Sequence, residues 1–291
     1  MIGKCLKEAD MDYTTLIVQA EADDDGRSRI ELALAVALQF KAMLVGIAAR
    51  DLVPLIPMMA IPGNPPGSST LLATEEGEIR AGLDTAEQLF RTLAEGTGAR
   101  ISWRSRIAAP ASVLAREART ADLIVVGRRP ERDSASWSRH ADPGDVLMRA
   151  GRPILVVPPG LSSLAADHVV IAWKDSLEAR RAVTDAMPFL TRAASVLVLQ
   201  VCDDASEQEL AAEIVRDVAT YLTGHGVAAT GEARLLREAT VSAELLLAAE
   251  QHGAELVVAG GYAHTRLQEW VFGGLTRTLL GHFPKCCLLS H

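Results

Sequence analysis

The sequence contains few residues of the kinds that build metal centres, disulfide frameworks and aromatic cores. Its four cysteines are Cys5, Cys202, Cys286 and Cys287, and they form no CxxC pair. None of them has the spacing to histidine that zinc sites use, so we expect reduced thiols and no metal. Aromatic residues make up only 4% of the chain, whereas Ala, Leu and Val are abundant. This balance favours helices packed on parallel strands over a β-sandwich.

The sequence also lacks a long apolar run and an excess of positive charge. The longest apolar stretches, 32–38 and 52–63, are too short to span a bilayer. The opening residues, MIGKCLKEAD, lack the apolar core of a signal peptide. The formal net charge is −8 at pH 7, and an acidic chain repels nucleic-acid phosphates and anionic membrane surfaces. The sequence therefore predicts a soluble cytoplasmic protein that binds neither nucleic acid nor membranes.

Motifs that mark common enzyme classes are missing as well. The chain contains no GxxxxGK[ST] phosphate loop, no GxGxxG, no GxSxG nucleophile elbow and no HExxH zinc motif. No grouping of Cys, His and Asp suggests a nucleophile, and His264, His282 and His291 show no ligand pattern. We therefore assign no catalytic residue and expect a binding protein rather than an enzyme.

What the sequence does contain is an internal repeat. The stretches ADLIVVGRRP and GRPILVVPP in the first half resemble AELVVAGGYA and FPKCCLLSH in the second, in the same order. Gly127 and Gly260, which follow the first pair of apolar runs, stand 133 positions apart. A period of this length indicates a duplicated domain, because solenoid repeats reach only about 50 residues.

Each half alternates short apolar runs with helical patterns. The runs are rich in β-branched residues and show no polar alternation, which is typical of parallel strands covered on both faces. We therefore predict two α/β domains, 1–159 and 167–291, each a doubly wound sheet of about five strands. The short linker GLSSLAA, residues 160–166, must hold the two domains close together.

The first half is longer than the second near its start. The first strands of the two halves are offset by 154 positions, so we expect an insertion of about twenty residues, at 51–70. Its sequence, DLVPLIPMMAIPGNPPGSST, predicts a loop. We favour a loop that folds back over its own core, and a lid or a partner contact is the alternative.

The segment GGYAHTRLQEWVFGGLTR, residues 260–277, places two glycines after a strand and two before a helix. Ligands of open parallel sheets bind at the carboxyl ends of the strands. Glycine lets a ligand or a neighbouring backbone approach closely, and the free N–H groups of a helix start favour an anion. Thr276 could add a hydroxyl and Arg277 a charge. The pattern suits a phosphate cradle, although such glycines also occur in connections that bind nothing.

This segment resembles a motif of the universal stress proteins, in which G-x-x-G is followed by nine residues and then G-(Ser/Thr). Gly260 matches its first glycine, Ala263 takes the place of the second, and Gly273 matches the third. Gly274 stands at the Ser/Thr position. The resemblance covers both halves, so the chain looks like a tandem universal stress protein.

The resemblance implies an internal pseudo-dimer and, in the second half, a site for ATP or another adenine nucleotide. In this pseudo-dimer the strand ILVVP would pair antiparallel with CCLLSH and bury Cys286 or Cys287 at the seam between the two halves. Lys174 departs from the family pattern, because ATP-binding relatives carry an Asp after the first strand, a place that Asp175 could take after a one-residue shift. The residues assigned to this ligand site are Lys174, Asp175, Val201, Gly260, Gly261, Ala263, Gly273, Gly274, Leu275 and Thr276.

The first half departs further from the family pattern. Glu21 stands at the end of its first strand, Arg128 and Arg129 follow Gly127, and Asp145 would repel a phosphate. We interpret this site as lost or changed, and we interpret the cluster of Arg128, Arg129 and Arg132 as a solvated loop rather than an anion site.

Three classes of function remain open. The leading one is a stress-response or signalling module that binds an adenine nucleotide in the second half. The others are a ligand-free interaction scaffold that uses 51–70, and a slow ATP-hydrolysing enzyme in which Asp175 binds a metal. The protein partner, and whether whole chains pair as homodimers, are left open.

Overall fold

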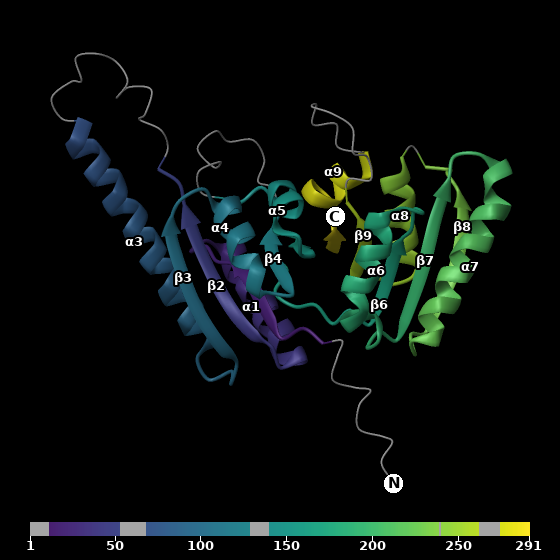
Figure 1. Cartoon of the computed structure of the whole chain (residues 1–291), viewed down its shortest axis with the longest axis horizontal. Helices are drawn as coiled ribbons and strands as arrows, with labels where there is room; N and C mark the ends of the chain where they lie inside the picture. The colour runs from purple at the N-terminus through teal and green to yellow at the C-terminus, as the bar shows by residue number, and fades with distance from the viewer. Residues whose placement is uncertain (1–11, 53–67, 129–139, 239, 262–273) are drawn as a thin grey trace, which may run out of the picture.

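A computed structural model describes residues 12–52, 68–128, 140–238, 240–261 and 274–291, without the side chains of 68–72. One sheet of ten strands runs through the molecule, flanked by helices (Figure 1). The first half contains β1 Thr15–Gln19, α1 Asp24–Phe40, β2 Met43–Arg50, α3 Ser68–Ala94, β3 Arg100–Ile107, α4 Pro110–Glu117, η1 Ala118–Thr120, β4 Leu123–Gly127, α5 Pro143–Ala150 and β5 Ile154–Val157. The second half contains β6 His168–Ala172, α6 Leu177–Leu190, β7 Ser195–Cys202, η2 Ala205–Glu207, α7 Gln208–Gly224, β8 Ala229–Leu235, α8 Val241–Gln251, β9 Leu256–Gly260, α9 Gly274–Gly281 and β10 Cys286–Ser290.

The strand order shows the duplication directly. It is β3-β2-β1-β4-β5-β10-β9-β6-β7-β8, so each half has the same order read outward from the centre. Neighbouring strands within each half are parallel. Only the central pair is antiparallel, with Cys287 opposite Val156 and Leu289 opposite Ile154. The predicted fold class and the predicted pairing of the two last strands are both confirmed.

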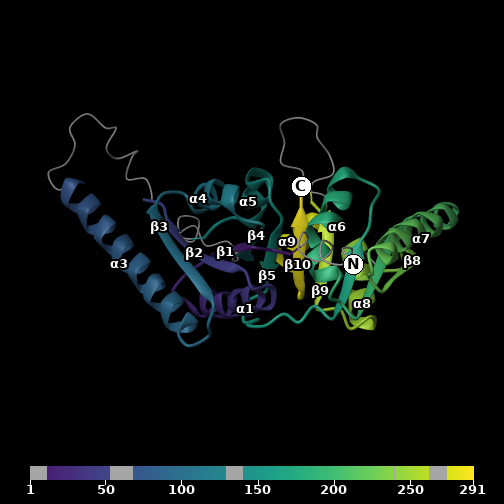
Figure 2. The same ribbon diagram turned by 60° about the horizontal axis from the view of Figure 1, so that its bottom comes forward.

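Helices cover both faces of the sheet. Side chains of α1, α3, α6 and α7 pack with one set of strand residues, and those of α4, α5, α8 and α9 pack with the alternate set. In Figure 2, α1 lies on one side of the first-half strands, and α4 and α5 lie on the other. The inner strands, such as β4, β5 and β10, are apolar because both of their faces are buried, whereas the edge strands β3 and β8 carry polar and partly exposed residues.

The seam between the halves is closed by more than the two central strands. Cys286 packs on one face of the sheet and Cys287 on the other, and both thiols are fully buried. Tyr13 donates a hydrogen bond to the carbonyl of Asp185 over 2.7 Å, from one half to the other. The predicted burial of a cysteine at the seam is therefore confirmed for both residues.

The predicted insertion is partly helical. The helix α3 begins at Ser68, so residues 68–70 belong to a helix and not to the loop that the sequence predicted. Ser and Thr are ordinary residues at a helix start, and their composition alone does not separate them from a loop. The helix α3 has 27 residues, whereas α7 of the second half has 17, so part of the extra length is helical. The remaining residues, 53–67, lie outside the described residues.

Helix starts follow their capping residues. The side chain of Ser176 accepts a hydrogen bond from the amide of Ala179 over 3.3 Å, as its predicted role of N-cap requires. Among the helices of the described residues, none combines the length and the apolar composition needed to cross a bilayer.

Candidate functional site

A cavity of about 80 Å³ opens at the carboxyl end of the first-half strands. It lies beside the ends of β1 and β4, which are neighbours in the sheet. The chain leaves β1 toward α1 on one face and β4 toward α5 on the other, which is the switch point where open α/β sheets bind ligands. Its charged lining residues are Glu21, Asp23, Asp25, Arg29, Arg128 and His140.

Glu21 is the centre of a polar network in this cavity. Its Oε2 accepts a hydrogen bond from Arg29 Nη2 over 2.5 Å, and its Oε1 accepts one from Gln19 Nε2 over 2.9 Å. The Nδ1 of His140 lies 2.7 Å from the same Oε1. The side chains of Arg29 and Glu21 are 5% and 15% exposed, so this ion pair is largely removed from water. A buried carboxylate requires such partners.

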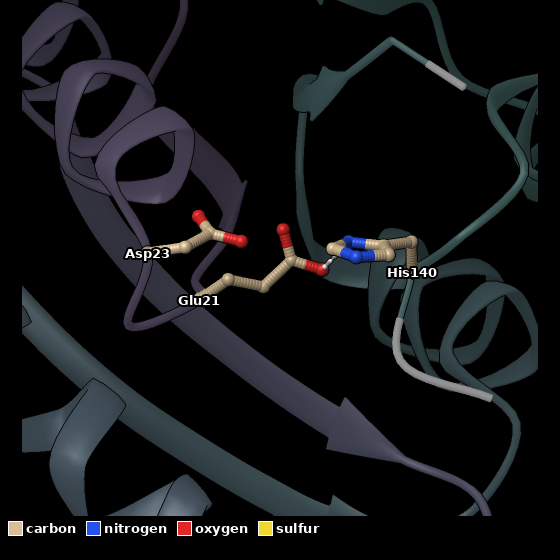
Figure 3. A group of neighbouring side chains, drawn as sticks. All are labelled: Glu21, Asp23 and His140. Carbon is tan, nitrogen blue, oxygen red and sulfur yellow. Dashed lines mark hydrogen bonds and ion pairs between the residues drawn. The ribbon is translucent and has the colours of Figure 1, made fainter. Parts of the chain in front are cut away.

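Asp23 joins this network from the start of α1. It is the N-cap of the helix, and its Oδ1 accepts from the amide of Gly26 over 2.6 Å. Gly26 is needed there, because a Cβ at this position would lie 2.3 Å from the carbonyl oxygen of Glu21. Figure 3 shows Glu21 between Asp23 and His140, with its carboxylate turned toward the imidazole. Two acids and one imidazole therefore converge from the β1–α1 connection and the segment before α5.

Charge and burial act together on Glu21 and His140. Burial raises the pKa of Glu21, but Arg29 and His140 outweigh it and hold the pKa below its ordinary value. The hydrogen bond with Glu21 raises the pKa of His140 against the opposing effect of burial. The pair is therefore stabilised as carboxylate and imidazolium.

Arg29 also explains the glycine at the end of β4. A Cβ at Gly127 would lie 2.1 Å from Arg29 Nη1, so the guanidinium occupies the space beside this strand end. The Nε of Arg29 donates to the carbonyl of Gln19 over 2.8 Å, which fixes the side chain in place. In the first half, Gly127 thus accommodates a side chain of the protein itself.

The structure corrects the interpretation of Arg128 as part of a solvated loop. Its guanidinium Nη2 donates to the carbonyl of Lys285 over 3.0 Å, across the seam to the second half. The side chain is half-buried rather than solvated, because the antiparallel contact of β5 and β10 brings the second half close to it. Arg129 and Arg132 lie outside the described residues.

The structure places several of the predicted ligand residues at the equivalent edge of the second half. Lys174 and Asp175 are exposed just after β6, and Val201 is half-buried near the end of β7 beside it. The strand β6 pairs with β7 along one edge and with β9 along the other, and β9 ends at Gly260. Ala263 and Gly273 lie outside the described residues.

The remaining predicted residues lie at the start of α9. Gly274 is exposed, with no heavy atom within 4 Å of where its Cβ would be. Leu275 is half-buried and Thr276 is buried. Asp175 forms an ion pair with Arg180 at the surface.

The glycines Gly260 and Gly261 pack closely against protein atoms. A Cβ at Gly260 would lie 2.5 Å from the backbone nitrogen of Ala179 in α6. A Cβ at Gly261 would lie 2.6 Å from Leu147 Cδ2 in the first half. Both glycines therefore allow close packing within this structure, and their contact with a ligand stays a prediction.

Two buried polar atoms near this edge lack a partner among the described residues. They are the Nε1 of Trp173 and the Oε1 of Gln200, which follow β6 and lie in β7 respectively. Buried polar groups are nearly always hydrogen-bonded, so a donor and an acceptor without partners indicate a place for a further polar group.

Sequence reasoning identified Glu21 but missed its neighbours in the first-half network, Gln19, Asp23, Arg29 and His140. Arg29 shares one face of α1 with Gly26, Ala33 and Ala37, and a charged residue on this face of small residues is the sequence signal that could have identified it. His140 is 119 positions from Glu21 and carries no motif, so only the fold brings the two together.

No protein-family model matches the sequence, and no curated protein matches it. Solved structures do resemble it. A universal stress protein from Archaeoglobus fulgidus is 14% identical, with 95% of each chain covered and a TM-score of 0.70. A universal stress protein described as putative, from Pseudomonas aeruginosa, is 14% identical, with 96% of this chain and 93% of that chain covered and a TM-score of 0.57. A functionally unknown protein from the same species has 14% identity, 96% and 92% coverage, and a TM-score of 0.56. This chain therefore has the universal stress protein fold, in two tandem copies that share one sheet.

Proposed function

We propose that this chain is a stress-response module that binds an adenine nucleotide in its second half, at the carboxyl ends of β6, β7 and β9. The observation that carries the proposal is a reversal of charge at equivalent positions. Two residues after β1 stands Glu21, whose side chain is 15% exposed and paired with Arg29. Two residues after β6 stands Lys174, which is exposed. A cation at this edge suits a phosphate, and a carboxylate does not.

The equivalent helices reinforce this difference. Arg29 lies six residues after its N-cap Asp23, and Ala182 lies six residues after its N-cap Ser176. The methyl group of Ala182 cannot extend to the strand end as the guanidinium of Arg29 does. The second half therefore lacks, at this position, the side chain that fills the first-half edge.

The proposed roles follow from position. The amides of Gly274 and Leu275 at the start of α9 would bind phosphate oxygens, because the first amides of a helix have no partner within it. Lys174 would add positive charge. The unpaired Nε1 of Trp173 and Oε1 of Gln200 would offer a donor and an acceptor near the nucleoside.

The proposal is tested by denaturing the purified protein and identifying any released nucleotide, followed by calorimetric titration with ATP. We expect Lys174→Ala and Gly274→Asp each to weaken binding about tenfold or more, because they remove or oppose a phosphate contact. Arg216→Ala is the control, since Arg216 is exposed on α7. Absence of heat for the wild-type protein, or equal affinity in all variants, would reject nucleotide binding here.

Two further measurements, a phosphate-release assay and a partner pull-down, separate the two alternatives. A slow ATPase would release phosphate and lose that activity in Asp175→Ala, although Asp175 already pairs with Arg180. A ligand-free scaffold would bind no nucleotide and would lose a protein partner when 51–70 is deleted.

A further inference from the structure

We infer that Glu21, Asp23 and His140 form a binding site for one divalent transition-metal ion of the zinc class. Their ligand atoms all lie within 4.8 Å of one another. In a tetrahedral site with bonds of about 2.1 Å, ligand atoms stand about 3.4 Å apart. Small side-chain rotations would therefore bring the three donors to a common ion (Figure 3).

The carboxylate of Glu21 is held in place before any ion binds. Arg29 contacts its Oε2 and Gln19 contacts its Oε1, and Gln19 in turn accepts from the amide of Gly127 over 3.3 Å. Such outer partners orient metal-binding carboxylates and are part of the site. Asp23 is exposed and is held by one contact, because its Oδ1 accepts from the amide of Gly26 at the start of α1. Its second carboxylate oxygen is the one that would turn to the ion.

The residues that line the cavity determine its net charge and the space available for an ion. The other charged groups that line the cavity are Asp25, Arg29 and Arg128. With His140 neutral, the three carboxylates and two guanidinium groups leave one net negative charge, which admits a cation but limits its affinity. The cavity of about 80 Å³ has space for an ion and a water molecule in an open coordination position.

The donor set selects the kind of ion. Mg²⁺ and Ca²⁺ favour oxygen ligands throughout, whereas an imidazole with carboxylates suits Zn²⁺, Co²⁺ and Ni²⁺. The proton that His140 shares with Glu21 would have to leave when the ion binds, since the metal takes the same nitrogen. Binding therefore releases a proton and weakens as the pH falls.

The test is calorimetric titration of the chelator-treated full chain with ZnCl₂, with MgCl₂ as the comparison. We expect one Zn²⁺ per chain, little response to Mg²⁺, and tighter binding at pH 7.5 than at pH 6. His140→Ala removes the only nitrogen ligand and should weaken binding at least tenfold. Asp23→Asn removes a carboxylate but keeps the helix cap, because Asn caps as well as Asp, and should also weaken it at least tenfold.

A control excludes adventitious binding at another histidine pair. His168 and His252 both contact Ser195 at the opposite end of the second-half strands. The double variant His168→Ala/His252→Ala should bind Zn²⁺ as the wild type does. No binding to the wild type, unchanged binding in Asp23→Asn, or loss in the control would overturn the proposal. Circular dichroism confirms folding, and if His140→Ala does not fold, Asp23→Asn decides.

Discussion

The guanidinium of Arg29 lies where a side chain on Gly127 would have to lie, with Nη1 2.1 Å from the position of a Cβ. Arg29 is 4% exposed and is fixed by Gln19 and Glu21, so it is part of the core of the first half. The carboxyl edge of that half is therefore occupied by its own ion pair. The two copies of the fold share their topology but differ in what stands at this edge.

The contact of Arg29 with Gly127 predicts a coupled effect on stability. Gly127→Ala should lower the free energy of unfolding by about 1–3 kcal/mol, because the added methyl group displaces the guanidinium from its partners. In an Arg29→Ala background the same substitution should cost much less. Urea denaturation of the four proteins measures this coupling. As a control, Gly77→Ala on α3, where no heavy atom lies within 4 Å of the added Cβ, should stabilise the protein by about 0.5–1 kcal/mol. Additive losses would show that the two residues do not share this space.

The contact of Gly260 with α6 predicts a loss of stability of at least similar size in the second half. Gly260→Ala should destabilise the protein by about 1–3 kcal/mol or more, since its Cβ would meet the backbone of Ala179, which cannot rotate away. Gly281→Ala in α9 has open space and should stabilise by about 0.5–1 kcal/mol. Thermal unfolding of both variants provides the measurement. A neutral Gly260→Ala would mean that β9 and α6 are not packed this closely.

The pair of Glu21 and His140 predicts a pH-dependent contribution to stability. The pKa of His140 is raised in the folded state by Glu21, so its contribution is complete below the unfolded value near 6.5 and is lost as the pH rises through the folded pKa. The stability difference between wild type and His140→Ala should thus be larger at pH 5.5 than at pH 8.5. Urea midpoints at both pH values measure it, and a constant difference would contradict the pairing.

Removing the negative charge of Asp185 should stabilise the folded protein at neutral pH. Burial raises the pKa of Asp185 despite a hydrogen bond from Ser290 Oγ over 2.8 Å. The folded state therefore retains its proton to higher pH, and stability is lost as the pH rises through that pKa. Asp185→Asn can still accept from Ser290, so its stability relative to wild type should increase between pH 4 and pH 7. The exposed Asp217→Asn serves as the control, and an unchanged difference for Asp185→Asn would refute the burial effect.

The fold was predictable because duplication leaves marks that survive in one sequence. The apolar strands before Gly127 and Gly260 recur at a fixed distance, and the strands covered on both faces show no polar alternation. Adjacent Cys286 and Cys287 had to face opposite ways in a strand, and they do. The start of α3 was misplaced because Ser and Thr are equally common in loops and at helix starts.

The site was less predictable because its members are joined only by the fold. Glu21 was recognised as a departure from the family pattern, but its partners Arg29 and His140 belong to a helix and to a distant segment. Nothing in the local sequence of His140 marks it as a partner of Glu21. Lys174 and Gly274 were located by position in the repeat, and their contact with a nucleotide remains a prediction.

The difference between the two carboxyl edges is tested most directly by the number of nucleotides that one chain binds. Native mass spectrometry of the purified protein with excess ATP gives this number. We predict one nucleotide per chain, with an occupancy that falls in Gly274→Asp and is unchanged in Asp23→Asn. Two nucleotides per chain, or one that persists in Gly274→Asp and disappears in Asp23→Asn, would contradict the assignment of binding to the second half.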